Sequence, residues 1–364
     1  MKDIVNKFLI DGEILNICEE KNGLVNKTYL IETSKTKYLL QKINHYVFKK
    51  PDELMSNIEL VTKHLKYKKK RTLEIVKTRN GMSYYYNGEN YYRVYKYMSD
   101  LKTMVLTNDK VCLEVGKAIG NFQLELFDLN HELLNVTIPN FHNILTRFNA
   151  LVTAYNSIDY SDLRKFNSNK CYNFIIMNIK KNMSIINAIK NGTIPLRITH
   201  NDTKLNNILF DKLTNKAICL IDLDTVMPGT ILFDFADSCR TSIVSLNEDS
   251  TDFDNIFLND KKFIYLTVGY LSKIKDFLTV DELNLLVESI GTIVLECATR
   301  FLTDYLNYDV YFKTEYDEHN LNRCKNQLKV YEKYLEKEIL YKKYLKIIYD
   351  RLNGNYIKVK EFEK

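Results

Sequence analysis

The stretch His200-Asn201-Asp202-Thr203-Lys204-Leu205-Asn206-Asn207 decides the fold, together with Asp222-Leu223-Asp224 further along the chain. The first stretch is polar and runs directly into an apolar segment, Asn207 to Phe210, that is typical of a strand. The second ends another apolar segment, Ala217 to Leu223, and the polar residues 211–216 form a tight loop between the two. Side chains alternate along a strand, so this pattern predicts that Asp222 and Asp224 share one face.

The residue types in these two segments suit phosphoryl transfer to a hydroxyl. That reaction needs a carboxylate beside the attacking hydroxyl and oxygen ligands for Mg²⁺. We expect Asp202 to orient the hydroxyl and take its proton, and we expect oxygens of Asn207 and Asp222 to hold the metal ion. Each residue taken alone is as readily a turn or cap residue. The His-x-Asp-x4-Asn spacing, the apolar strand after it and the later Asp-x-Asp are much harder to obtain together by chance.

The composition limits the classes of protein to which the chain can belong. A chain of 364 residues, 45% apolar and 27% charged, is too long for one comfortable core and predicts two lobes. The net charge of +6 is small and its lysines are scattered, which gives no support to a nucleic-acid partner. The chain contains no apolar run long enough for a membrane span. Seven cysteines without a CxxC pair favour reduced thiols and a cytoplasmic location, and no obligate protein partner is evident.

The first hundred residues predict a small antiparallel sheet with one helix. A hairpin is expected over Lys27 to Glu32 and Lys37 to Ile43, and apolar spacing after Pro51 predicts a helix over Asp52 to Lys66. Hairpin turns at Asn80-Gly81 and Asn87-Gly88 then separate three further strands, predicted at Leu73 to Thr78, Met82 to Tyr86 and Tyr91 to Tyr97. Residues 1–98 are the expected nucleotide-binding lobe, with a hinge near 93–100.

Residues 99–364 predict a larger, mainly helical lobe that carries the catalytic and substrate sites. One buried stripe is marked by Val111, Val115, Ile119, Phe122 and Leu126. The tail from Asn322 to Leu352 predicts an amphipathic helix whose apolar side is formed by Leu328, Tyr331, Leu335 and Ile339. The isolated histidines His142 and His319 are interpreted as structural.

The central motifs resemble those of the aminoglycoside phosphotransferase and choline kinase superfamily, and within it the N-acetylhexosamine 1-kinases. The resemblance rests on the two quoted stretches, the second continuing as Thr225-Val226-Met227-Pro228-Gly229, and covers nearly the whole chain. It continues in Tyr38-Leu39-Leu40-Gln41-Lys42-Ile43-Asn44, Asp234-Phe235-Ala236-Asp237-Ser238-Cys239-Arg240, Arg300-Phe301-Leu302-Thr303-Asp304-Tyr305-Leu306 and Asp309-Val310-Tyr311-Phe312. It implies an α+β, protein-kinase-like, two-lobed fold and an ATP- and Mg²⁺-dependent small-molecule kinase.

The same resemblance implies roles for the residues of the catalytic half. Asp202 becomes the catalytic base, Asn207 and Asp222 the Mg²⁺ ligands, and His200 the residue that braces the loop. For Asp224, two interpretations stay open. It either adds a contact to the metal site or holds the turn that follows.

In the nucleotide lobe, the resemblance implies that Lys42 reaches the ATP phosphates and pairs with Glu59 on the 52–66 helix. A one-residue slip in the strand register would leave Lys42 as an ordinary exposed lysine. The turn over residues 21–28 has a single glycine, so either its amides bind phosphate, helped by Asn26 or Thr28, or it is a plain hairpin turn. Adenine is expected against residues 92–98, where Tyr95 and Tyr97 either line its site or pack the strands.

For the acceptor, the resemblance implies a sugar pocket formed by Arg240, Arg300, Asp304 and Tyr311. Arginine on a helix is also commonly a surface or ion-paired residue. The predicted reaction is phosphorylation of the anomeric hydroxyl of N-acetylglucosamine or N-acetylgalactosamine. The alternatives are another acceptor such as an aminoglycoside, choline or an amino alcohol, and a catalytically silent nucleotide-binding regulator. A protein kinase is disfavoured because neither Asp-Phe-Gly nor Ala-Pro-Glu follows Asp222.

Overall fold

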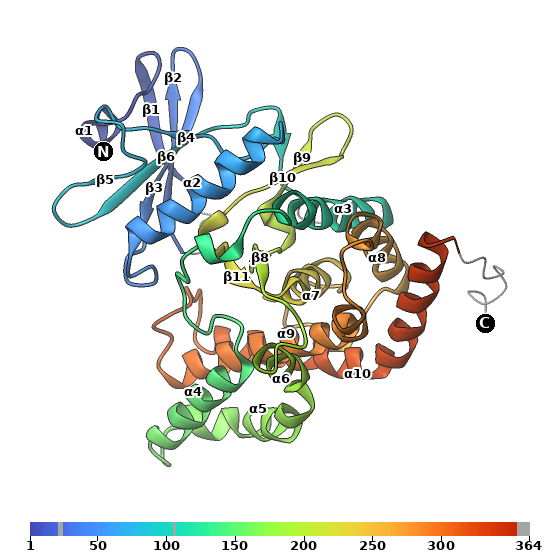
Figure 1. Cartoon of the computed structure of the whole chain (residues 1–364). Coiled ribbons are helices and arrows are strands. Elements are labelled where there is room, and N and C mark those ends of the chain that lie inside the picture. Colours follow the sequence, from blue (N-terminus) through green and yellow to red (C-terminus); the bar gives the residue numbers. More distant parts are fainter. Residues whose placement is uncertain (21–24, 105–106, 355–364) are drawn as a thin grey trace.

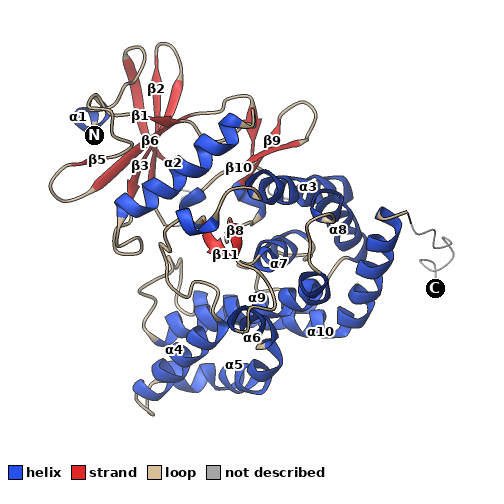
Figure 2. Cartoon of the chain, in the orientation of Figure 1, coloured by secondary structure: helices blue, strands red, loops and turns tan. Residues whose placement is uncertain are grey.

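A computed structural model of the chain describes residues 1–20, 25–104 and 107–354. A small sheet formed by the first hundred residues lies at one end of the molecule, and helices make up most of the remainder (Figures 1 and 2). The predicted α+β class and its division into a sheet part and a helical part are confirmed.

The sheet of the first lobe is antiparallel, with the order β1-β2-β3-β6-β4 and β5 paired to β6. Its strands are β1 (Ile14–Glu20), β2 (Lys27–Thr33), β3 (Lys37–Ile43), β4 (Ile75–Val76), β5 (Tyr85–Tyr86) and β6 (Tyr91–Lys96). The predicted hairpin is therefore present as β2 and β3. The strands expected before Asn80 and before Asn87 shrink to two residues each. The one predicted helix is α2 (Pro51–Tyr67), and a short α1 (Lys2–Val5) precedes the sheet.

The two faces of this sheet carry different contacts. Tyr38 and Leu40 of β3 and Tyr92 of β6 are buried on one face, in a small cluster with Val5 and Phe8. The alternate residues of the same two strands point to the other face of the sheet. There Ile43 of β3 and Tyr95 of β6 join the core that includes α2.

The second lobe is built from long helices packed around α9. The helices are α3 (Asp109–Leu126), α4 (Ile144–Ser157), α5 (Leu163–Ile179), α6 (Ser184–Lys190), α7 (Ile231–Ser242), α8 (Asp260–Ile274), α9 (Val280–Leu306) and α10 (His319–Leu352). The predicted stripe of α3 is buried throughout. Helices α3 and α8 approach closely because each has a glycine where it meets the backbone of the other helix. A Cβ on Gly116 would lie 2.0 Å from the Leu266 carbonyl oxygen, and one on Gly269 would lie 2.1 Å from the Leu113 carbonyl oxygen.

Short strands between the helices position the candidate site. β7 (Leu101–Lys102), β9 (Ile208–Asp211) and β10 (Ala217–Leu220) form one sheet, and β8 (Arg197–Thr199) pairs with β11 (Met227–Gly229). Short 3₁₀ turns η1 (His131–Leu133), η2 (Lys180–Asn182), η3 (Leu205–Asn207), η4 (Leu223–Thr225) and η5 (Phe253–Asn255) complete the described elements. Both quoted motifs therefore fall on connections that leave short strands.

The two lobes share one hydrophobic core. Buried residues of β3 and α2, such as Ile43 and Ile58, belong to the same cluster as those of α3, α7 and α9. Asn57 of α2 adds a polar tie, because its side-chain amide donates to the Val226 carbonyl oxygen at 3.0 Å.

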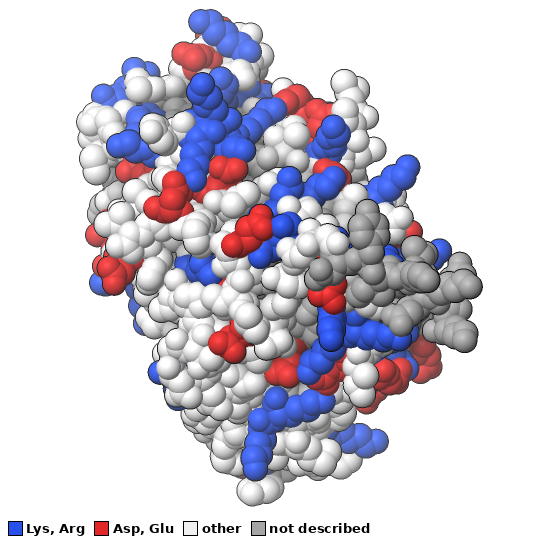
Figure 3. All heavy atoms as spheres, turned by 45° about the vertical axis from the view of Figure 1, so that its right-hand side comes forward, with Lys and Arg blue, Asp and Glu red and all other residues white. Residues whose placement is uncertain are grey.

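The apolar side predicted for the tail is correct for its first half. Leu328 and Tyr331 of α10 are buried, whereas Ile339 is 85% exposed. Within the described ranges, no helix is both long and apolar enough to cross a bilayer. On the face shown in Figure 3, basic and acidic side chains are interspersed across the surface of the sheet part and of the helices.

Candidate active site

The connection between β8 and β9 carries Asp202, and a buried carboxylate on α7 anchors its backbone. The backbone N–H groups of His200 and Asn201 donate to Asp234 of α7, at 3.0 and 2.7 Å. Gln123 of α3 donates to the same carboxylate at 3.0 Å. Asn201 adopts a left-handed conformation with φ of 63°, which Asn tolerates better than most residues. These hydrogen bonds fix the backbone of the two residues that precede Asp202.

The ring of His200 is completely buried and its two nitrogens have distinct partners. Nε2 lies 2.9 Å from the Ile221 carbonyl oxygen, and Nδ1 accepts the backbone N–H of Asp202 at 3.3 Å. A carbonyl oxygen only accepts, so the proton of the neutral ring sits on Nε2. His200 thus joins the Asp202 loop to the segment that leads to Asp222, as a bracing residue would.

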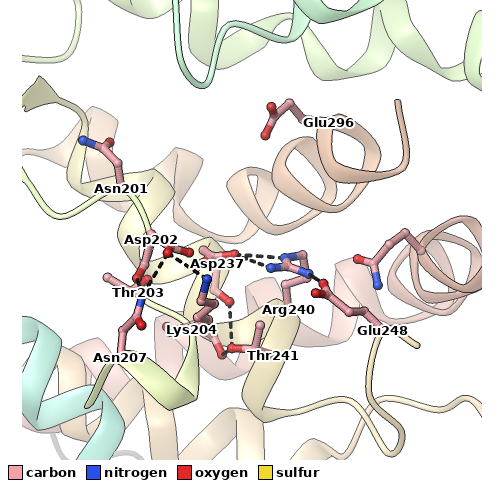
Figure 4. Close-up of polar contacts among 12 residues, drawn as sticks. Asn201, Asp202, Thr203, Lys204, Asn207, Asp237, Arg240, Thr241, Glu248 and Glu296 are labelled. Carbon is pink, nitrogen blue, oxygen red and sulfur yellow. Dashed lines mark hydrogen bonds and ion pairs between the residues drawn. The ribbon is translucent and has the colours of Figure 1, made fainter. Parts of the chain in front are cut away.

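Asp202 contacts two residues of its own loop (Figure 4). Its Oδ2 lies 2.9 Å from Nζ of Lys204 and accepts from Nδ2 of Asn207 at 2.8 Å. Burial acts to raise the pKa of Asp202, but the charge and hydrogen bond of Lys204 outweigh it and lower the pKa below its usual range. The pKa of Lys204 is raised despite burial, chiefly by the charge of Asp202. About a quarter of each side chain is exposed, so both can meet a ligand.

The segment after β10 departs from the predicted alternation. β10 ends at Leu220, and Asp222 has φ of 60°, in the left-handed region, before the chain enters η4. Asp222 and Asp224 therefore do not share a strand face, because the chain turns between them.

The two carboxylates have different surroundings. Asp222 accepts no hydrogen bond from any residue in the described part of the chain. Burial, and then the charges of Asp224 and Asp202, raise the pKa of Asp222 to about 7. Asp224 is 3% exposed and contacts Arg93 and Asn26 of the first lobe. Asp224, predicted as a metal ligand, is thus already paired with a protein cation.

Asn207 and Asp222 fit a divalent cation by their donor chemistry. The amide nitrogen of Asn207 is turned to Asp202, which leaves its carbonyl oxygen without a hydrogen bond from a described residue. Asp222 is a partly buried carboxylate without donors and with two like charges nearby, an environment that a cation would relieve. No cluster of three or more His, Cys, Asp or Glu occurs among the described residues, and none is needed where phosphates and waters complete the shell of Mg²⁺.

The nucleotide side differs most from the prediction. In the described ranges, Lys42 makes no ion pair, and Glu59 pairs with Lys77 instead. The cause is strand register. Lys42 faces Tyr92 and lies on the sheet face of Leu40, whereas Gln41 lies opposite Arg93 on the face toward the second lobe. The slip considered for Lys42 is therefore the arrangement that the chain adopts.

The other residues expected around ATP are engaged with neighbours. Thr28 accepts a hydrogen bond from Gln41 at 3.2 Å, and Asn26 donates to Asp224 at 2.7 Å. The turn that precedes them, Lys21 to Leu24 with Gly23, lies outside the described residues. Tyr95 is 4% exposed with its ring 5.2 Å from the guanidinium carbon of Arg93, so it packs the lobe interior. Tyr97 is 37% exposed directly after β6, where its N–H donates to the Lys37 carbonyl oxygen.

The residues expected to bind the acceptor divide into two kinds. Arg240 lies between Asp237 and Glu248, at 2.9 and 2.7 Å, and Asp304 accepts the backbone N–H groups of Tyr311 and Phe312 (Figure 4 shows Arg240). Both are engaged by internal partners, and their contact with an acceptor stays a prediction.

Arg300 and Tyr311, by contrast, have fewer internal hydrogen bonds. Tyr311 is half exposed, and Arg300 forms an ion pair with Glu296 at 3.8 Å but donates no hydrogen bond to a described residue. The guanidinium of Arg300 lies within 6.0 Å of the rings of Phe141, Tyr311 and Phe312. Burial acts to lower the pKa of Arg300. The negative charge of Glu296, with a smaller contribution from Asp202, outweighs burial and raises this pKa.

Sequence reasoning gave no site role to Lys204 and Glu296, and it interpreted a third residue near the site, His142, as structural. Lys204 stands two residues after Asp202, so its place in the quoted loop was a usable signal. His142 and Glu296 were not detectable, because they come from distant segments that meet only in the fold. Nε2 of His142 lies 2.9 Å from the Asn201 carbonyl oxygen, and Nδ1 lies 3.1 Å from Glu296, so the ring connects the Asp202 loop to α9. Nε2 of His319 lies 3.0 Å from Asp249, and its interpretation as a structural residue stays a prediction.

Comparisons with known proteins agree with this arrangement. The model of the family described as phosphotransferase enzyme family matches residues 19–257, more than half of the chain. An aminoglycoside phosphotransferase from Alicyclobacillus acidocaldarius is similar in fold, with a TM-score of 0.60 at 13% identity over 97% of this chain and 96% of that one.

Two further solved structures share the fold. An ethanolamine kinase from Plasmodium vivax gives a TM-score of 0.55 at 15% identity, with 86% of this chain and 82% of that chain covered. A choline kinase from Cryptosporidium parvum gives 0.56 at 15% identity, with 93% and 94% covered. At such identities the likeness concerns the fold alone. The family match, together with the Asp202 loop and the free oxygens of Asn207 and Asp222, leads to one conclusion: this chain belongs to the phosphotransferase enzyme family.

Proposed function

We propose that the protein transfers the γ-phosphoryl group of ATP to the anomeric hydroxyl of an N-acetylhexosamine, N-acetylglucosamine or N-acetylgalactosamine. The observation that carries the transfer is the arrangement of Asp202, Lys204 and Asn207 in one fixed loop beside Asp222. This arrangement supplies a carboxylate for the hydroxyl, an ammonium for the phosphates and two oxygens for a metal ion.

Asp202 is the residue that meets the attacking hydroxyl. Its pKa lies below the usual range, so the carboxylate is ionised at neutral pH and can accept a hydrogen bond from the hydroxyl and then its proton. An anomeric hydroxyl is more acidic than an ordinary alcohol, so a weak base suffices. A bond forms between the anomeric oxygen and the γ-phosphorus, the bond from the γ-phosphorus to the β–γ bridging oxygen breaks, and ADP leaves with that electron pair.

Two cationic groups offset charge around the transferred phosphoryl. Lys204 keeps its proton, because the neighbouring charges of Asp202 and Asp222 outweigh the effect of burial and raise its pKa, so it can contact a phosphate oxygen beside the catalytic carboxylate. Mg²⁺, held by Asn207 and Asp222, would offset the negative charge of the phosphates. The bracing of the loop by Asp234 and His200 keeps these groups in place without the cost of reorganisation.

The surroundings of Arg300 favour a neutral acceptor. Quaternary ammonium and amine acceptors are commonly bound on open aromatic faces or by acidic groups. Here the rings of Phe141, Tyr311 and Phe312 already contact the Arg300 guanidinium, and Glu296 is surrounded by His142, Arg147 and Arg300. The guanidinium offers N–H donors suited to sugar hydroxyl and acetamide oxygens.

An acceptor panel tests the proposal. The purified protein is incubated with ATP, Mg²⁺ and, in separate reactions, N-acetylglucosamine, N-acetylgalactosamine, glucose, galactose, choline, ethanolamine and an aminoglycoside. ³¹P resonances then identify the product. We expect a sugar 1-phosphate and ADP in equal amounts from the N-acetylhexosamines. If only the cationic acceptors are phosphorylated, or if the sugar carries phosphate at another position, the proposal is wrong.

A further inference from the structure

The turn that ends α9 has a backbone conformation that its residues rarely adopt. The Tyr308 N–H donates to the Tyr305 carbonyl oxygen at 3.2 Å. The Asp309 N–H donates to the Asp304 carbonyl oxygen at 2.9 Å, which closes the helix end. In this kind of turn the residue at the Tyr308 position has a left-handed backbone and is usually glycine. Here Tyr308 has φ of 63° and Asp309 has φ of 58°, so the backbone is strained at an aromatic residue.

Contacts with α5 hold this turn. Nη1 of Arg164 donates to the Tyr305 carbonyl oxygen and to Oδ2 of Asp309, at 2.6 Å in each case. The ring of Tyr308 lies 5.2 Å from the guanidinium carbon of Arg164, and its hydroxyl donates to Asp162, the N-cap of α5, at 2.8 Å. A glycine would adopt the backbone conformation without strain but could make neither side-chain contact.

The Asp304 carboxylate fixes the segment that follows the turn. Its Oδ1 accepts the backbone N–H of Tyr311 at 2.8 Å, and its Oδ2 accepts that of Phe312 at 2.9 Å. Nδ2 of Asn320, at the start of α10, donates to the same carboxylate and to Asp309, at 2.9 Å in each case. Asp304 is 4% exposed, so its oxygens are engaged inside the protein and hold the backbone on either side of Val310.

This segment places two aromatic rings against Arg300. The guanidinium carbon of Arg300 lies 6.0 Å from the ring centre of Tyr311 and 5.4 Å from that of Phe312. Asp202 is close enough for its charge to contribute to the raised pKa of Arg300. The position of the segment therefore decides where the rings and the guanidinium stand relative to the catalytic carboxylate.

We propose that Asp304 is a positioning residue for the acceptor: together with the left-handed turn at Tyr308, it holds Tyr311 and Phe312 in place before the acceptor arrives. A wall that is already ordered lowers the entropic cost of binding. The inference rests on the proposed function in so far as Arg300 and Tyr311 border the acceptor site. It does not depend on which acceptor is phosphorylated.

Amide exchange tests the positioning role without any acceptor. Hydrogen–deuterium exchange of the full-length, ligand-free protein is followed by mass spectrometry of peptides that cover residues 307–316. Asp304→Asn replaces one accepting oxygen with an amide donor that faces a backbone N–H, so exchange in this segment should accelerate by about tenfold or more. Unchanged exchange would overturn the inference.

Glu288→Gln is the matched control. It makes the same carboxylate-to-amide change about four turns earlier on α9, at a solvent-accessible ion pair with Lys342. It should leave exchange of residues 307–316 as in the wild type. Equal acceleration in both variants would show a general loosening of α9 and would contradict the role of Asp304.

Steady-state kinetics links the segment to the acceptor. With whichever acceptor the panel identifies, Asp304→Asn should raise the acceptor KM by about tenfold and change the KM for ATP by less than about threefold. A raised acceptor KM with unchanged exchange would mean that Asp304 contacts the acceptor directly, and accelerated exchange with an unchanged acceptor KM would remove the segment from the acceptor site. Either result would overturn the inference.

Arg164→Gln tests the same turn from α5. Its side chain is 23% exposed, so the substitution is less disruptive to folding, and the contacts of Asp304 remain. It should accelerate exchange of residues 307–316 and raise the acceptor KM, both by less than Asp304→Asn. If Asp304→Asn does not fold, Arg164→Gln decides, and unchanged exchange in that variant would overturn the inference. Failure of the sugar assignment would appear only in the acceptor panel, because the exchange experiment contains no acceptor.

Discussion

Glu296 of α9 allows a prediction whose size follows from the structure. Its carboxylate is 2% exposed and is surrounded by His142, Arg147 and Arg300. Burial acts to raise the pKa of Glu296, but the hydrogen bond from His142 and the arginine charges outweigh it, and the pKa falls from 4.5 to about 2. At about 1.4 kcal/mol for each pH unit, this difference stabilises the folded state by about 3 kcal/mol.

The sign of the pH dependence follows from the lowered pKa. The contribution is fully present above the pKa of the unfolded chain, 4.5, and is lost as the pH falls toward the folded value of about 2. At about pH 3.5 roughly 1.4 kcal/mol of it should be gone. Glu296→Gln removes the titrating group, so the difference in unfolding free energy between wild type and variant should shrink by that amount between about pH 7 and pH 3.5.

Urea denaturation followed by far-ultraviolet circular dichroism measures this difference at both pH values. The control is Glu336→Gln, which removes an exposed partner of Lys333 on α10 and should cost about 0.5 kcal/mol or less at either pH. If the difference between wild type and Glu296→Gln is the same at both pH values, the carboxylate is not held ionised by its neighbours, and the reasoning about His142 and the arginines is refuted.

Three further predictions concern the catalytic loop. Asp202→Asn should lower turnover by about 10²- to 10⁴-fold while ATP binding, measured by calorimetry, is kept, and near-wild-type turnover would exclude Asp202 as the base. Lys204→Ala should lower kcat strongly, because Lys204 lies beside the catalytic carboxylate. Lys42→Ala should change kcat and the KM for ATP by less than about threefold, because Lys42 lies on the outer sheet face. A larger loss for Lys42→Ala than for Lys204→Ala in steady-state kinetics would place Lys42 in the site. Asp234→Asn should lower the unfolding free energy by about 1–3 kcal/mol and reduce kcat, because one of its oxygens becomes an amide donor that faces backbone N–H groups; unchanged thermal unfolding would contradict the anchoring role.

Periodic and local features of the fold were predictable from the sequence. The β2–β3 hairpin and the buried stripe of α3 follow from alternation and from spacings of three and four, which are set within a few residues. The stripe of α10 failed at Ile339, because the buried side of this helix continues through Tyr341, Leu345 and Ile348, and Ile339 lies outside that stripe.

The contact between Asp202 and Asn207 was predictable because both residues lie on one tight loop, so their spacing nearly determines it. Lys204 stands in the same loop but was given no role, although its contact with Asp202 follows from the same closeness in sequence. The nucleotide half of the site was not predictable, because it depends on strand register. A shift of one residue exchanges Lys42 for Gln41 on the inner face, and nothing local to β3 indicates that Gln41 accepts hydrogen bonds from Arg93 of β6.

The backbone at Asp222 has a consequence for the balance between stability and activity. A non-glycine residue with φ of 60° is held in a sparsely populated conformation, at a cost of about 1–2 kcal/mol, and its carboxylate lies among like charges without a donor from the described residues. Asp222→Asn would tolerate the same φ and remove the repulsion. We expect this variant, measured by thermal unfolding without ligands, to be more stable than the wild type although inactive. Selection for stability alone would thus erode the site at this position first.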